Sequence, residues 1–150
     1  MTEPKHFVII AIHATSHLGQ LLQLCLNLLD LYPTIQATFL YADLTASRFD
    51  RALGNQPDDL VRRVKSRLHD RGVYTGTQAG VEVGEIETIM TFAKVLSPVI
   101  EGLVTGKGEG GWSTVPSGFF VDVSSSPLSS TQITLLVARR SHLLTLIAHP

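Results

Sequence analysis

The chain is poor in cysteine and in charge. Its 150 residues include one cysteine, 17% of them are charged, and the net charge is −1 at pH 7. A single cysteine cannot form an internal disulfide, which is typical of a reducing compartment. The small net charge gives no electrostatic reason to expect binding to nucleic acid or to an anionic membrane surface. Cys25 lies among leucines and is interpreted as a core residue, not as a nucleophile.

Long apolar runs are also missing. The run at residues 7–12 (FVIIAI) is too short for the core of a signal peptide and too short to cross a bilayer. We therefore expect a cytoplasmic protein without a membrane span. Because 44% of the residues are hydrophobic, a chain of this length can bury a core, and we expect one domain of ordinary size.

The chain lacks the motifs of phosphate loops and metal sites. The glycine-rich segment 106–117 (GKGEGGWSTVPS) follows a predicted helix and precedes a predicted strand, the reverse of the order in a P-loop. His13 and His17 have the i, i+4 spacing of some zinc ligands, but no HExxH motif, cysteine cluster or third ligand accompanies them. We expect neither a metal nor a resident cofactor.

Strand and helix patterns alternate along the first part of the chain. Residues 7–12 are apolar and rich in β-branched side chains, which is typical of a parallel strand covered on both faces. Leucines recur at helical spacing from Leu21 to about Leu31, and Pro33 ends that helix. Residues 35–41 (IQATFLY) predict a second strand. This order predicts an α/β fold, a Rossmann-like parallel sheet with flanking helices.

The second half continues the alternation as far as residue 123. The charged segment 57–71 predicts a helix with Gly72 as its C-cap. Residues 82–105 predict a long amphipathic helix, and residues 119–123 (FFVDV) predict a buried strand. The composition then changes, since SSSPLSS has five serines in seven positions.

His17 and Asp122 are 105 positions apart, yet each lies close to the carboxyl end of a predicted parallel strand. In an open α/β sheet, ligands bind at that edge. The positive end of a helix dipole disfavours the imidazolium form of a histidine at the helix N-terminus, so His17 could accept a proton. A nearby aspartate would fix the tautomer and balance the charge that the ring gains. The alternative is structural, with both residues serving as helix caps.

The same residues resemble the inverting UDP-dependent glycosyltransferases, a family with the two-lobed GT-B fold. Members open with an apolar strand, a P-x-x-G-H-x-x-P motif and a leucine-rich helix, which resemble His13-Ala-Thr-Ser-His17-Leu-Gly-Gln20 and the following LLQL. Here His13, Ser16 and Gln20 replace the prolines and the glycine of the motif. The stretch GGWSTVPSGFFVDV is similar to the segment that carries the second catalytic residue of the family, with Asp122 at its place. The residues of this stretch resemble those of fungal members in particular.

The resemblance implies that residues 1–123 are the acceptor-side lobe of a hexosyltransferase. His17 would remove a proton from a hydroxyl of a small, partly apolar acceptor, and Asp122 would orient and stabilise His17. The activated oxygen would then attack the anomeric carbon of a UDP-sugar with inversion. Thr15 and Ser16 would reach the donor or the acceptor.

The resemblance ends at residue 123. We expect residues 124–150 to be a divergent, truncation-related tail, with the donor-binding C-terminal lobe absent. The isolated chain is then expected to be inactive, because one lobe cannot close the donor cleft. Two alternatives stay open: a non-catalytic module that binds a small molecule or a protein, and a flavodoxin-like protein in which His17 and Asp122 lie far apart.

Overall fold

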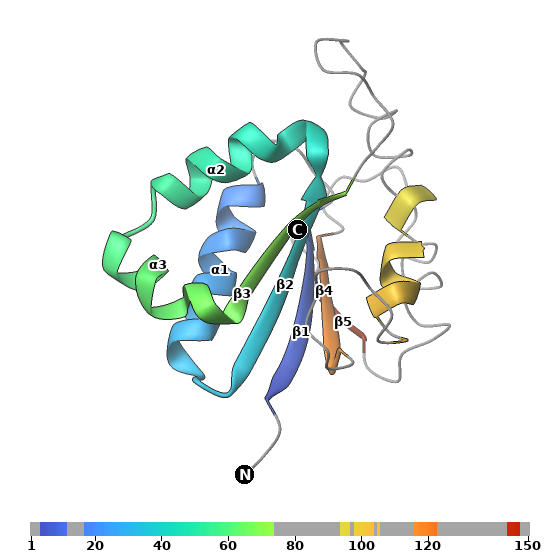
Figure 1. Cartoon of the computed structure of the whole chain (residues 1–150), viewed down its shortest axis with the longest axis horizontal. Helices are drawn as coiled ribbons and strands as arrows, with labels where there is room; N and C mark the ends of the chain where they lie inside the picture. Colours follow the sequence, from blue (N-terminus) through green and yellow to red (C-terminus); the bar gives the residue numbers. More distant parts are fainter. Residues whose placement is uncertain are drawn as a thin grey trace.

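The computed structural model shows a parallel β-sheet with helices on both of its faces (Figure 1). It describes residues 4–11, 17–73, 94–96, 98–103, 105, 116–122 and 144–147, and only the backbone of residues 17, 44, 121, 122 and 144–147. The strands are β1 (Lys5–Ala11), β2 (Ile35–Ala42), β3 (Leu68–Val73), β4 (Gly118–Asp122) and β5 (Leu144–Ile147). They form a five-stranded sheet in the order β3-β2-β1-β4-β5, and each neighbouring pair is parallel. The predicted Rossmann-like α/β fold is confirmed.

The helices lie on opposite faces of the sheet. One face carries α1 (His17–Leu31), α2 (Ala46–Gly54) and α3 (Asp58–Val64), and the other carries the helical residues 94–96 and 98–103 (Figure 1). Two short 3-10 turns, η1 (Asp43–Thr45) and η2 (Lys65–Arg67), precede α2 and β3. Residues 82–93, the first part of the predicted long helix, lie outside the described residues.

The side chains of β1 contribute to the core on both faces. Ile9 packs in a cluster with the apolar side of α1, while Val8 and Ile10 pack in a second cluster with Leu96 and Ile100. Alternate residues of a strand point to opposite faces, so a strand covered on both sides needs a continuous apolar run. The apolar pattern at residues 7–12 therefore predicted this strand correctly, although β1 begins at Lys5.

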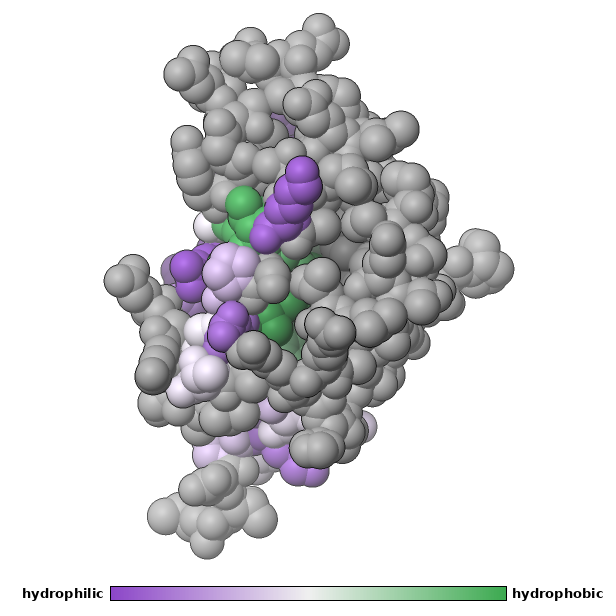
Figure 2. All heavy atoms as spheres, turned by 90° about the vertical axis from the view of Figure 1, so that its right-hand side faces the viewer, coloured by the Kyte–Doolittle hydropathy of each residue, from purple (hydrophilic) through white to green (hydrophobic). Residues whose placement is uncertain are grey.

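The described residues on the side of the molecule that carries residues 98–103 differ in hydropathy. Figure 2 faces this side, and hydrophilic residues (purple) lie there beside hydrophobic ones (green). Ile100 and Leu103 are buried against the sheet, while Val99 is partly buried and Glu101 is exposed. This segment is thus amphipathic, as the sequence predicted.

Helix α1 buries its leucine face against the sheet. Leu22, Leu26 and Leu29 are almost completely buried, and Cys25 lies among them with no exposed surface. Burial raises the pKa of the Cys25 thiol to about 12, because the thiolate loses its hydration. Cys25 is therefore a core residue, as expected.

The prediction of one helix over residues 57–71 is wrong in its second half. Helix α3 ends at Val64, and β3 begins at Leu68 and contains Gly72. The strand lacks an apolar pattern because β3 is the outer strand beside β2, and Val73 is its single buried residue. Gly72 is not a helix cap: a Cβ there would lie 3.3 Å from Cε2 of Tyr41, so this position favours a residue without a side chain.

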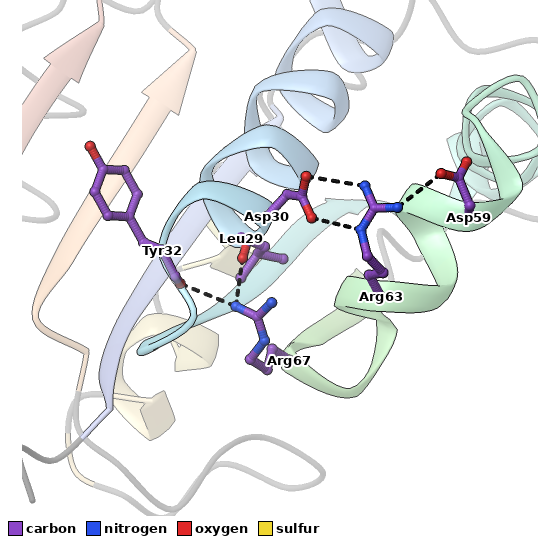
Figure 3. A network of polar contacts seen from close by, with 6 residues as sticks. All are labelled: Leu29, Asp30, Tyr32, Asp59, Arg63 and Arg67. Atoms are coloured by element: carbon purple, nitrogen blue, oxygen red, sulfur yellow. Dashed lines mark hydrogen bonds and ion pairs between the residues drawn. The ribbon is translucent and has the colours of Figure 1, made fainter.

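Arg67 binds the carboxyl end of α1 (Figure 3). Its Nη1 donates hydrogen bonds to the carbonyl oxygens of Leu29, Tyr32 and Ile35, at 2.6, 3.1 and 3.3 Å. The last turn of α1 has no basic residue of its own. Arg67 therefore supplies both the donors and the positive charge that a helix C-terminus needs.

Arg63 forms a second, more exposed link between α1 and α3. Its Nε and Nη2 donate to the two carboxylate oxygens of Asp30, at 3.0 and 3.2 Å, and its Nη1 donates to Asp59 at 2.8 Å (Figure 3). The hydrogen bonds from Arg63 lower the pKa of both carboxyl groups. Because the three side chains are exposed, we expect this link to stabilise the fold less than Arg67 does.

We predict that Arg67→Ala lowers the free energy of unfolding by about 1–3 kcal/mol, since carbonyl groups at the end of α1 lose their donor. Urea denaturation measures the change. Arg63→Ala is the control and should cost less. An equal or larger loss in Arg63→Ala would contradict this assignment.

Candidate functional site

The strand order reverses beside β1. From β1 the chain moves outward to β2 and β3, and it then returns to place β4 on the other side of β1. In open parallel sheets, ligands bind outside the carboxyl ends of the strands that flank such a reversal. The topology therefore indicates a candidate site at the carboxyl ends of β1 and β4.

Strands β1 and β4 end almost level with each other. Ile10 pairs with Val121, β1 ends one residue later at Ala11, and β4 ends one residue later at Asp122. Because the two strands are parallel, both ends lie on the same edge of the sheet. The backbone of Asp122 therefore lies at the candidate site, next to the end of β1.

Helix α1 begins at the same edge. Its last turn lies near the start of β2, where Arg67 bridges Leu29 and Ile35. Its first turn packs in the cluster that holds the carboxyl ends of β1 and β2, since Leu18 is buried there with Ala11 and Tyr41. His17 is the first residue of α1, so its backbone belongs to this edge.

The charge distribution at the start of α1 is simple. The helix has 15 residues, and no acidic residue occurs in its first turn. The positive end of the helix dipole is therefore not offset by a carboxylate of the same turn, and negative charge is favoured at this end of α1.

The structure thus brings the backbones of His17, the first residue of α1, and Asp122, the last residue of β4, to one edge of the sheet. Contact between the two side chains stays a prediction, because both side chains lie outside the described part of the chain. Thr15 and Ser16, the two further predicted site residues, also lie outside the described residues.

Among the described residues, no group of three or more histidine, cysteine, aspartate or glutamate residues is gathered as a metal site requires. No helix among the same residues has the length and the apolar character needed to cross a membrane.

Tyr41 and Asp70 form a polar contact near the site that the sequence did not reveal. The Tyr41 ring stacks on Phe49, with centroids 4.5 Å apart and an interplanar angle of 10°. Its hydroxyl donates a long hydrogen bond, 3.5 Å, to Oδ2 of Asp70 on β3. The pKa of Tyr41 is raised to about 12. Burial is the main cause, and the negative charges of Asp70 and Asp50 add to it. The tyrosine in this apolar strand could have indicated such a contact, because a buried tyrosine hydroxyl needs a hydrogen-bond partner.

His6 and Thr38 form a buried polar pair away from the carboxyl edge. His6 has no exposed surface, and its Nε2 lies 2.8 Å from the Thr38 hydroxyl oxygen. His6 is the second residue of β1, so it lies toward the amino end of the strand. We therefore assign this pair to the core and not to the site. The sequence showed only a histidine before an apolar run.

Comparisons with known proteins add no relative. No family profile matches the chain, and a search of curated proteins finds no significant match.

We predict that the phenol of Tyr41 ionises near pH 12 in the folded protein, against an ordinary value of 10.0. Between these values the unfolded chain loses this proton while the folded chain keeps it, so stability falls as pH rises from about 10 to 12. Absorbance of tyrosinate measures the transition. Tyr41→Phe should remove the absorbance change near pH 12, Tyr32→Phe should leave it unchanged, and Asp70→Asn should move its midpoint to lower pH. If Tyr41→Phe removed an absorbance change at lower pH instead, the assignment would be contradicted.

Proposed function

We propose that residues 1–123 are the acceptor-side lobe of a UDP-dependent glycosyltransferase of the GT-B type. The proposal is supported by one observation above all: the first residue of α1 and the last residue of β4 lie at the same edge of the sheet, where the strand order reverses. Those two residues are His17 and Asp122, the positions that resemble the catalytic pair of the family. The fold class agrees with a Rossmann-like lobe.

In the proposed reaction His17 is the general base. A hydroxyl group is a poor nucleophile while it keeps its proton, so the imidazole removes that proton as the oxygen attacks. The new bond joins the acceptor oxygen to the anomeric carbon of the sugar. The bond from that carbon to the UDP oxygen breaks, UDP leaves with the electron pair, and the configuration inverts.

Asp122 serves His17 in this scheme. Its carboxylate accepts a hydrogen bond from the second ring nitrogen of His17, which fixes the tautomer. It also balances the positive charge that the ring gains with the proton. Asp122 is therefore a positioning residue, and His17 is the residue that contacts the reacting hydroxyl.

The donor needs a second lobe. In the family the UDP-sugar is bound chiefly by a C-terminal lobe, and no segment of this sequence resembles that lobe. We propose that this lobe is supplied by another chain or another segment, and that Thr15 and Ser16 contact the substrates in the closed cleft. The single cysteine supports a cytoplasmic location.

We predict that the isolated 150-residue chain releases little or no UDP from UDP-glucose in the presence of a panel of phenols, because one lobe cannot enclose the donor. A coupled assay for UDP measures the rate. Measurable transfer by the isolated chain would overturn the requirement for a second lobe.

We predict that fusion of residues 1–123 to the C-terminal lobe of a family member yields UDP release that depends on His17. Loss of the general base in His17→Ala should lower the rate about 10²–10⁴-fold, and Asp122→Asn should lower it less. His69→Ala is the matched control, because His69 lies on β3, two strands from β1, and its loss should leave the rate unchanged.

A fusion that binds phenols but transfers no sugar would contradict the proposal. Phenol binding that His17→Ala leaves intact would then favour a non-catalytic binding module.

A further inference from the structure

We propose that the end of the chain, through strand β5, holds Asp122 in position at the candidate site. This inference rests on the proposed function, since it concerns the residue that orients the general base. It assigns a role to a part of residues 124–150, which the sequence alone presents as a divergent tail.

The pairing register carries the inference. Strand β1 pairs with β4 from Phe7↔Gly118 to Ile10↔Val121. Strand β5 pairs with β4 from Phe119↔Leu144 to Asp122↔Ile147. Asp122, the last residue of β4, thus has a register partner on β5.

The last residue of a strand is easily displaced when no neighbour is paired with it. Strand ends fray at a low free-energy cost, whereas backbone held in a ladder resists local opening. A residue that orients a catalytic base must keep its place to within about 0.5 Å. Pairing of Asp122 with Ile147 of β5 supplies this restraint at the end of β4.

The test measures the effect of β5 on His17 in the full chain, without substrate. A carboxylate close to an imidazole favours the protonated ring and raises its pKa. We therefore follow the His17 ring by NMR as a function of pH and identify its signal by its loss in His17→Gln. Asp122→Asn is the reference, and it should lower the pKa of His17.

Two proline substitutions form a matched pair on β5. The N–H groups of consecutive strand residues point to opposite sides, so one of Thr145 and Leu146 donates to β4 and the other points away from it. Proline removes the N–H group, and it is tolerated in an outer strand where that group faces away from the sheet. We expect one of Thr145→Pro and Leu146→Pro to lower the pKa of His17 in the direction of the Asp122→Asn value, and the other to leave it unchanged.

The outcomes separate this inference from the proposed function. If Asp122→Asn shifts the pKa of His17 and neither proline variant does, β5 does not position Asp122 and the inference is overturned. If Asp122→Asn itself causes no shift, the His17–Asp122 pair and the proposed function fail together. If the proline variants do not fold, amide hydrogen exchange of the unaltered chain decides. If the amide of Thr145 or Leu146 exchanges as slowly as the amides of β4, the inference is supported. If both amides exchange faster than those of β4, the inference is overturned.

Discussion

Parallel pairing of β1 with β4 is the constraint on which the candidate site depends. The two strands are separated by more than 100 residues, yet they pair in register over four positions. Since parallel strands end on the same edge, this pairing alone brings Asp122 beside the end of β1. Without it, β1 would have a partner on one side, and the reversal of strand order that marks the site would not exist.

The first half of the chain fixes the other side of the site. A leucine face holds α1 against the sheet, and Arg67 binds its carboxyl end to the start of β2. A helix that is fixed at its far end and along its length has a defined beginning. The position of His17 is therefore set by contacts made well away from the site, in the core and at the opposite edge.

The sequence predicted the elements that have a strong internal pattern. Strands β1, β2 and β4 are apolar, and α1 repeats leucine at helical spacing, so each could be recognised locally. Strand β3 could not, because an outer strand exposes His69, Asp70 and Arg71 at least in part, and its charge pattern is typical of a helix surface. Polar pairs such as His6 with Thr38 depend on register between distant segments, which no local pattern contains.

For the site, the sequence predicted that His17 and Asp122 lie at the carboxyl ends of parallel strands, and the structure places their backbones at one edge of the sheet. The pairing of Asp122 with Ile147 could not be predicted, because register between distant segments leaves no local pattern. The most direct test of the account is the distance between the His17 ring and the Asp122 carboxylate in an experimental structure of the chain. The account predicts a nitrogen–oxygen distance of about 2.6–3.2 Å, within reach of a hydrogen bond. Side chains that point away from each other, at a distance beyond the reach of one bridging water, would contradict it.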